Sequence, residues 1–302
     1  MLGTGLIGRA IGAAAPPVAG TLRMAETMAA DFARAFETPD DWFEARDPEY
    51  IRQTLPALRA MSELYFRAEV TGLGHIPSDE PVLLVGNHSG GTLIADTFVF
   101  AQHFYDHFGP ERRFHQLAHD LVFKVPGART VSRYGTVPAS PENMRRALDL
   151  GAALLVYPGG DQESYRPTWE SGTIDFAGRM GFAKLSLEHE TPIVPVVAIG
   201  GQETALFLGR GRRVSRALGL DRALRLKVFP VQVAPPTGIT LLDLPLRIPL
   251  PAKITIQVLP RIDLREELGA KAKPRDAYEL VTERMQDTLT ELADDRTLPI
   301  LG

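Results

Sequence analysis

The sequence predicts an α/β fold: a mostly parallel central sheet flanked by helices, preceded by an N-terminal helical segment. Three short apolar runs, each bounded by turn-forming residues, support this prediction: residues 81–84, 152–157 and 193–199. Short apolar runs of this kind are typical of strands that are buried on both faces. Segments with helical spacing separate them, and strands that alternate with helices indicate parallel crossover connections.

The part of the chain before the first of these strands has the spacing of helices. Apolar residues recur at helical intervals there, with a break at Pro39–Asp41 and a bend expected at Pro56. We therefore divide the chain into an N-terminal helical segment, residues 1–66, and a second domain, residues 67–302. The apolar stripe on these helices most often packs on a core, and a membrane-facing role is the alternative.

Several elements are predicted downstream. The clearest is a helix that follows the N-cap Ser140, has Pro141 at its first position and ends before Gly151. The others are a helix over residues 176–189, a strand over residues 253–259 and an amphipathic helix over residues 276–292.

Composition narrows the class of protein. The chain has 302 residues, 44% of them hydrophobic and 23% charged, which is ordinary for a globular protein. Its net charge of −4 gives no reason to expect a nucleic-acid partner. The absence of cysteine excludes disulfides, a cysteine nucleophile and thiolate metal sites. No apolar run is long enough to span a bilayer, and the N-terminus lacks the basic start of a signal peptide.

Residues with special chemistry gather where the first buried strand ends, in the segment Asn87–Gly91. His88 lies just past the strand, and the two glycines that follow allow a tight turn close to a ligand. A helix predicted from Thr92 onward would bring Asp96 back toward the imidazole. A histidine that donates to a carboxylate is held in one tautomer and becomes a better base. The alternative is a structural histidine and a solvated aspartate.

The second buried strand ends in another glycine-rich turn, which contains Gly159 and Gly160. Glycines at the end of a parallel strand expose backbone N–H groups to an oxyanion or a phosphate. Open α/β sheets bind ligands in the crevice at the carboxyl ends of their strands. We therefore expect this turn and His88 to line one crevice.

Two other groups of residues are candidates for binding an anion or a metal ion. The turn-rich segment 125–135 contains Arg133, whose forked donors suit an anionic group, although a solvated surface arginine is the alternative. The pairs His103/His107 and His115/His119 have the i, i+4 spacing of metal ligands on a helix. Because the second pair falls in a segment with a strand pattern, we predict no metal site.

Four of these blocks, taken in order, resemble the sequence blocks of the glycerolipid acyltransferases, the family of 1-acylglycerol-3-phosphate acyltransferase. They are Asn87-His88 with Asp96, Gly127 to Arg133, Tyr157-Pro158-Gly159-Gly160 with Glu163-Ser164, and Pro192 to Val196. Three details are closer to the diacylglycerol acyltransferase and phytyl ester synthase branch. They are Pro-Gly-Gly in place of Pro-Glu-Gly, the run Gly181-Phe182-Ala183-Lys184-Leu185, and the Pro- and Leu-rich residues 241–250.

The resemblance, which covers about residues 68–264, implies an O-acyltransferase. It implies that His88, assisted by Asp96, removes the proton of a lipid hydroxyl, which attacks the acyl thioester, acyl-CoA, while the amides around Gly159 and Gly160 hold the oxyanion. Acyl-CoA is a co-substrate, and no cofactor is implied. Arg133 is the candidate for a phosphate of CoA or of the acceptor. Glu163 is the candidate for binding the acceptor or for ordering the loop.

This sequence departs from the family pattern in two ways. Seven residues separate His88 from Asp96, whereas the family has four, and a Ser-Gly-Gly loop before the helix would absorb the difference. The arginine that follows the glycine block in phosphate-using relatives is missing, with only Arg166 nearby. The second departure favours a neutral alcohol as the acceptor.

The region after the third strand suggests a lipid setting. A basic stretch from Arg210 to Lys227 is followed by a Pro- and Leu-rich run over residues 228–251. Each basic residue near an anionic bilayer contributes about 1 kcal/mol. We therefore expect a cytoplasmic protein that associates peripherally with the inner face of the cell membrane; a solvated charge run is the alternative.

Two other functions remain open at this stage. A serine hydrolase would also use histidine and aspartate, but the chain has no G-x-S-x-G elbow. A non-catalytic lipid-binding protein would need the same crevice but not the imidazole.

Overall fold

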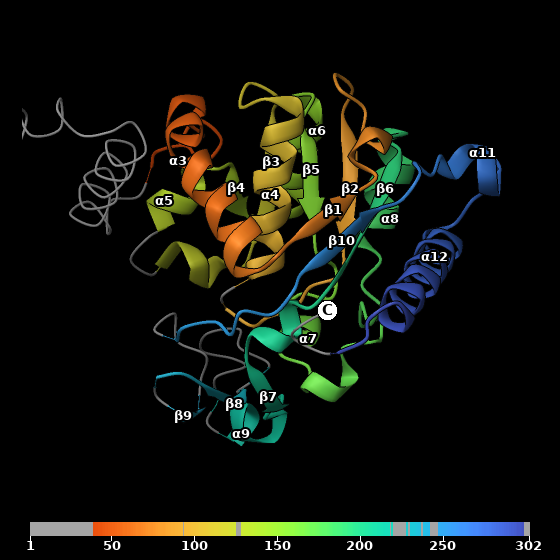
Figure 1. The fold of residues 1–302 in the computed structure, drawn as a ribbon. Helices are drawn as coiled ribbons and strands as arrows, with labels where there is room; N and C mark the ends of the chain where they lie inside the picture. The colour runs from red at the N-terminus through yellow and green to blue at the C-terminus, as the bar shows by residue number, and fades with distance from the viewer. Residues whose placement is uncertain are drawn as a thin grey trace, which may run out of the picture.

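The structure is a computed structural model that describes residues 39–92, 94–124, 128–217, 219, 228, 230–236, 238–241 and 247–298. Within those residues the chain forms a seven-stranded central sheet and a three-stranded small sheet (Figure 1). Helices cover both faces of the central sheet. The predicted α/β class is therefore confirmed.

The central sheet is mostly parallel. Its strands are β1 (Glu69–Thr71), β2 (Val82–Gly86), β3 (Phe114–Ala118), β4 (Thr136–Pro138), β5 (Ala153–Val156), β6 (Ile193–Ile199) and β10 (Thr255–Val258). They lie in the order β1-β10-β6-β2-β5-β3-β4. The strands from β6 to β4 are parallel, β10 runs antiparallel to β6, and β1 runs parallel to β10. The small sheet contains β7 (Leu206–Gly209), β8 (Val231–Ala234) and β9 (Gly238–Leu241), all antiparallel.

The helices vary from one turn to six. The longer ones are α3 (Pro48–Ala60), α4 (Ala95–Phe108), α6 (Pro141–Asp149), α8 (Gly181–His189) and α12 (Pro274–Asp294). The shorter ones are α5 (Ala128–Arg133), α7 (Asp161–Ser164), α9 (Arg212–Ala217) and α11 (Leu264–Leu268). A π-helical turn (Met61–Tyr65) continues α3, and 3₁₀ turns cover Leu73–His75, Asp120–Lys124, Thr168–Glu170 and Gly201–Thr204.

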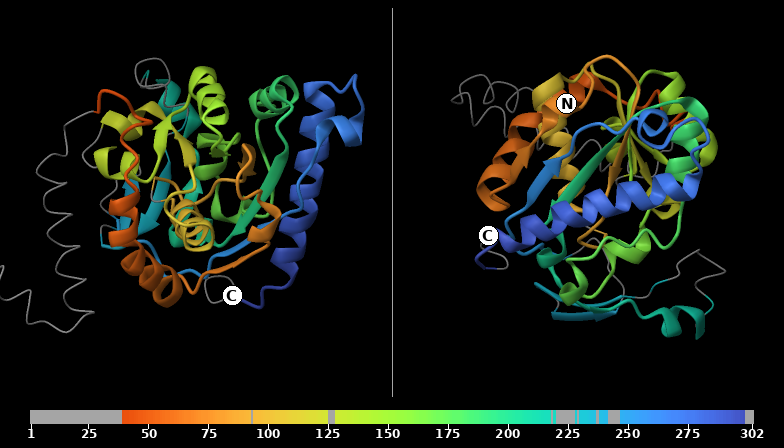
Figure 2. Two further views of the ribbon diagram at one scale, coloured as in Figure 1. Left: turned by 90° about the horizontal axis from the view of Figure 1, so that it is seen from above. Right: turned by 90° about the vertical axis from the view of Figure 1, so that its right-hand side faces the viewer.

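Two apolar cores lie on opposite faces of the central sheet. Figure 2 shows the helices that cover each face. Helices α3 and α4 cover one face, where Leu84 and Leu155 point. Helices α6, α8 and α12 cover the other face, where Leu83 and Leu154 point. Every residue of β2, β5 and β6 is buried. Burial on both faces explains why these strands are continuous apolar runs rather than alternating ones.

Most predicted boundaries agree with the structure. The helix over residues 176–189 is the main error, since α8 begins only at Gly181. Residues 176–180 form a turn instead: the Asp175 side chain accepts a hydrogen bond from the Ala177 N–H, and Ala177 and Gly178 both have positive φ angles. Positive φ is incompatible with a right-handed helix.

The N-terminal prediction is only partly covered by the described residues. Residues 1–38 lie outside them, and so does the Val125–Gly127 part of the arginine segment. The later helix is present: Asp47 caps α3, which contains Pro56 without ending there. The domain boundary at residue 66 stays a prediction. No helix in the described part of the chain is long and apolar enough to cross a membrane.

The end of β2 is fastened to β6 by one side chain. Asn87, 1% exposed, donates its Nδ2–H to the Ala198 carbonyl and accepts the Ala198 N–H, both at 2.8 Å. The amide thereby acts as a further strand residue where β2 ends. It also fixes the start of the loop that contains His88.

We predict that Asn87→Ala lowers the free energy of unfolding by about 2–3 kcal/mol, because it leaves a buried N–H and a buried C=O of Ala198 unpaired. Chemical denaturation measures the change. Gln53→Ala, which removes an exposed hydrogen bond to Glu49, is the control and should cost less than about 0.5 kcal/mol. A loss no larger for Asn87→Ala than for the control would contradict this role.

Candidate active site

The loop that follows β2 lies at the carboxyl edge of the parallel strands, beside α7 and the end of β5 (Figure 1). Gly90 and Gly91 have φ angles of 87° and 66°, which favour glycine, and α4 begins only at Ala95. The loop therefore occupies the switch region where open α/β sheets bind ligands.

The His88 ring is half-buried and stacks on the ring of Tyr157, with centroids 4.3 Å apart and planes 19° from parallel. Gly86 makes this possible, since a Cβ there would lie 2.6 Å from the Tyr157 ring. Burial, together with the nearby positive charge of Arg166, lowers the pKa of His88 to about 3. The imidazole is therefore neutral near pH 7.

The His88 backbone is held from both sides. The Glu163 carboxylate accepts the His88 N–H through Oε2 at 3.0 Å, and the Arg166 guanidinium donates to the His88 carbonyl at 3.0 Å. The two side chains are 0% and 1% exposed and form an ion pair at 3.6 Å. Glu163 also accepts the Asp175 N–H at 3.0 Å, and Arg166 donates to the Thr173 carbonyl. The ion pair therefore fixes the position of the His88 backbone, from which the imidazole extends.

Gly159 is needed for the same arrangement. A Cβ on Gly159 would lie 2.2 Å from Cγ of Glu163, so only glycine leaves room for that side chain. The two amides predicted to hold an oxyanion, those of Gly159 and Gly160, differ in their hydrogen bonds. The Gly160 N–H already donates to the Tyr157 carbonyl at 3.1 Å, whereas the Gly159 N–H has no hydrogen-bond partner among the described residues. Of the two, the Gly159 amide is the one without such a partner, and the residue is buried.

Asp96 does not make the predicted hydrogen bond to His88. Its carboxylate accepts the Ser89 N–H at 3.1 Å, the Ser89 hydroxyl at 2.9 Å and the Thr97 N–H at 2.7 Å. His88 Nδ1 is buried and has no partner in the described part of the chain. The three extra loop residues let the Ser89 backbone and hydroxyl reach Asp96, and their hydrogen bonds take up the carboxylate. The catalytic role of Asp96 stays a prediction.

Burial raises the pKa of Asp96 to about 6, although the hydrogen bonds from Ser89 and Thr97 oppose the shift. Burial likewise raises the pKa of Glu163 to about 7, against the opposing charge of Arg166. Two buried carboxyl groups with raised pKa values beside a neutral histidine are typical of a functional site.

Three buried side chains that hold the loop were not predicted from the sequence. Besides Arg166, they are Gln202, which accepts the Gly90 N–H at 3.0 Å, and Arg247, which donates to the Gly90 carbonyl. Gln202 also donates to the Arg166 carbonyl. These residues come from three distant parts of the sequence, so no local spacing signals their meeting. The only sequence signal was the position of Arg166 just after the glycine block.

Arg133 lies elsewhere. It ends α5 and pairs with Asp47 at 2.8 Å, with its guanidinium 3.5 Å above the centre of the Tyr50 ring. These contacts tie α5 to the start of α3 rather than to the His88 loop. Its predicted role in binding a phosphate stays a prediction.

The histidine pairs do not converge on a ligand. His103 and His107 lie on α4, whereas His115 lies on β3 with His119 just beyond it, and the His115 Nδ1 is 3.0 Å from the Gly135 carbonyl. No cluster of three or more ligating side chains occurs among the residues that the structure describes.

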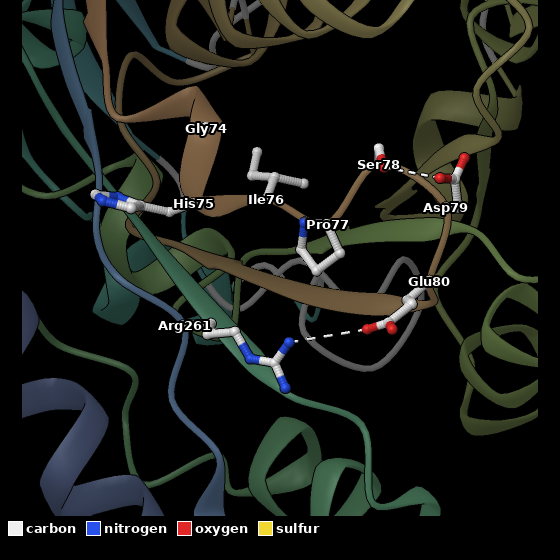
Figure 3. Close-up of a pocket in the computed structure, with 8 residues that line it drawn as sticks. All are labelled: Gly74, His75, Ile76, Pro77, Ser78, Asp79, Glu80 and Arg261. Atoms are coloured by element: carbon white, nitrogen blue, oxygen red, sulfur yellow. Dashed lines mark hydrogen bonds and ion pairs between the residues drawn. The ribbon is translucent and has the colours of Figure 1, made fainter.

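A cavity of about 400 Å³ opens among Gly74–Glu80 and Arg261 (Figure 3). It adjoins the amino end of β2, whereas His88 follows the carboxyl end.

The fold and the site together define an α/β protein with a neutral histidine at the carboxyl edge of its sheet. Comparison with known proteins identifies the class. Residues 67–199 match the Acyltransferase family model. Residues 67–199, which include β1 to β6, therefore belong to the acyltransferase family.

Individual proteins are also similar to this chain. An uncharacterized protein of Mycobacterium tuberculosis is 30% identical over 246 residues, which are 80% of this chain and 66% of that protein. This chain thus spans just under two thirds of that relative. A human protein named as a DGAT1/2-independent enzyme synthesizing storage lipids is 30% identical over 151 residues, 50% of this chain and 45% of that protein. The crystal structure of the 1-acyl-sn-glycerophosphate (LPA) acyltransferase PlsC from Thermotoga maritima matches with a TM-score of 0.53 over 90% of both chains at 16% identity, a likeness of fold.

We predict that Arg166→Met destabilises the protein by about 3–5 kcal/mol, because it leaves the Glu163 carboxylate buried without its cation. Denaturant unfolding measures the loss. Arg52→Met, which breaks exposed ion pairs with Glu49 and Glu111, should cost less than about 1 kcal/mol. The double variant Glu163→Gln with Arg166→Met should recover part of this loss of stability. Equal losses for the single and double variants would contradict the role of the ion pair.

Proposed function

We propose that the protein transfers a fatty acyl group from an acyl thioester, acyl-CoA, to the hydroxyl of a lipid. The observation that carries this proposal is the state of His88: neutral, half-buried, and fixed at its peptide by Glu163 and Arg166. A base for a hydroxyl proton needs that protonation state and a defined position. Membership in the acyltransferase family supplies the reaction class.

In the proposed reaction, His88 removes the proton of the acceptor hydroxyl, and the oxygen attacks the thioester carbonyl. The oxyanion of the tetrahedral intermediate accepts a hydrogen bond from the Gly159 N–H. The carbon–sulfur bond then breaks, and the imidazolium returns the proton to the leaving thiolate. The products are an ester and a free thiol. No covalent acyl-enzyme and no cofactor takes part.

Asp96 contributes charge rather than a direct hydrogen bond in this proposal. It is anchored to Ser89, the residue next to His88, so its negative charge stabilises the imidazolium as it forms. Glu163 was predicted to bind the acceptor or to order the loop. Its full burial and its hold on the His88 N–H favour loop order.

The acceptor that we propose is a neutral lipid alcohol such as diacylglycerol. Arg166, the first arginine after the glycine block in the sequence, is 1% exposed and occupied by backbone carbonyls, so it is not presented to a phosphate. One human relative is named for storage-lipid synthesis, which agrees with a neutral product. We place the enzyme peripherally at the inner face of the cell membrane.

A serine hydrolase is the weaker candidate. The Ser89 hydroxyl is directed to Asp96 at 2.9 Å, and the residue is 4% exposed. A nucleophile would need that hydroxyl to face both the imidazole and a substrate. Loss of ester formation in the His88→Ala variant would distinguish the enzyme from a lipid-binding protein without catalytic activity.

We predict that His88→Ala lowers kcat/KM for ester formation by about 10²–10⁴-fold, the usual contribution of a general base. Mass spectrometry of products from acyl-CoAs and a panel of lipid alcohols measures it. His107→Ala, an exposed histidine on α4, is the control and should be unchanged. Ester formation by a folded His88→Ala protein at the wild-type rate would remove the base from the mechanism.

We also predict an acid limb near pH 6 in the kcat/KM profile. The carboxyl of Asp96, with its pKa raised to about 6, gains a proton as the pH falls through that value and loses the charge that stabilises the imidazolium. His88 stays neutral down to about pH 3 and does not produce the limb. Asp96→Asn should lower kcat and lack the limb, whereas Asp106→Asn should keep it. A limb that persists in Asp96→Asn would contradict the assignment.

A further inference from the structure

The outer face of the small sheet is aliphatic. The register places Leu206, Val233 and Ile239 side by side across β7, β8 and β9. Leu206 is 43% exposed, Ile239 is 71% exposed, and Leu208, two residues along β7 on the same face, is 40% exposed. An antiparallel sheet with one face in water normally turns polar side chains outward. This face has the opposite character.

The inner face of the same sheet already has its partners. Phe207 and Gln232, which lie opposite each other in the register, are 0% and 1% exposed. The Phe207 ring lies 6.3 Å from the Tyr165 ring, and the Arg247 guanidinium lies 5.6 Å from the Phe207 ring. The aliphatic row is therefore not a core that has been turned outward by a slip of one residue. It is a second apolar face, on the side away from the domain.

An exposed tryptophan adjoins this face. Trp169, 67% exposed, belongs to the 3₁₀ turn Thr168–Glu170, which is fastened to β7 because the Thr168 hydroxyl accepts the Phe207 N–H at 2.9 Å. Figure 1 shows this turn beside β7 at the lower edge of the molecule. Tryptophan has an apolar ring with a polar N–H and is enriched where membranes meet water.

The charge of this region points to an anionic surface. Residues 205–241 contain seven basic residues and one acidic residue, although the whole chain has a net charge of −4. Arg212 and Arg216 of α9 are exposed. A second copy of the chain would bring the same positive charge to the contact and be repelled, whereas anionic headgroups would be attracted. Aliphatic side chains beside arginines suit the boundary between acyl chains and headgroups.

The small sheet is also joined to the His88 loop. Tyr165, against which Phe207 packs, is hydrogen-bonded through its hydroxyl to Thr92 at 2.8 Å. Arg247 donates to the carbonyls of Thr204 and Gly90. A membrane bound at the small sheet would therefore lie close to the loop where the acceptor must arrive.

We propose that the outer face of β7–β9, defined by Leu206, Leu208, Val231, Val233 and Ile239, together with Trp169, docks on a lipid bilayer with anionic headgroups. This inference rests on the proposed lipid substrate and identifies the surface through which that substrate reaches the site. The aliphatic side chains enter the acyl boundary, and the exposed Arg216 of α9 faces the headgroups.

The test is co-sedimentation of the full chain with vesicles of phosphatidylcholine, with or without phosphatidylglycerol. Wild type should bind the anionic vesicles and release at high salt. Leu206→Glu with Ile239→Glu should lower the bound-to-free ratio by about tenfold or more, because both aliphatic side chains leave the contact. Leu206→Ser with Ile239→Ser is the milder variant, for use if the glutamates disturb the sheet. Leu150→Glu, at an exposed leucine just before β5 at the other end of the central sheet, is the control and should bind as wild type.

Each outcome decides the proposal. Wild-type binding by a folded double variant, or no binding by wild type, would overturn the docking surface. A wild-type dimer that the double variant dissociates, without vesicle binding, would assign the face to a second copy instead. His88→Ala should still bind vesicles while ester formation is lost. Vesicle binding and ester formation thus fail separately, so the docking surface and the proposed chemistry are distinguishable.

Discussion

The arrangement of the site depends on the buried ion pair of Glu163 and Arg166. One member holds the N–H of His88 and the other holds its carbonyl, so the backbone on both sides of one residue is fixed by two opposite charges that also bind each other. Two buried charges are costly to desolvate unless each is paired and hydrogen-bonded, and here each has further backbone partners. The gain is a histidine whose position does not depend on its own side-chain hydrogen bonds. Accordingly, the ring nitrogen Nδ1 has no hydrogen-bond partner in the described part of the chain.

This constraint explains several residues around it. Gly159 is a glycine because the Glu163 side chain occupies the space of its Cβ, and Gly86 is a glycine because the Tyr157 ring lies there. Arg166 also keeps the imidazole neutral, since a second positive charge beside it is unfavourable. Asp96 is removed from direct contact with the ring and bound to Ser89 instead. In the proposed reaction, the positioning of His88 by the ion pair is thus separate from its electrostatic support by Asp96.

The sequence predicted most of the elements that build the site. The runs at β2, β5 and β6 were clear because burial on both faces leaves a continuous apolar signal. The start of α8 was missed because apolar Phe176 is buried in a turn, where it contributes to the helical pattern without being helical. The small sheet was missed because its short strands lie among basic and proline-rich residues that resemble a surface segment. Candidate residues could be named from type and position, but their partners could not.

The sequence by itself determined the fold class, the placement of His88 and the glycine corner at neighbouring strand ends, and the family that those blocks resemble. These follow from local patterns, in which periodicity and turn residues act over a few positions. Only the tertiary structure decided which groups meet: that Glu163 and Arg166 hold His88, that Asp96 binds Ser89, and that Arg133 pairs with Asp47. Such contacts join residues from separate elements, and the sheet order and crossovers that bring them together are not written in any short stretch of the chain.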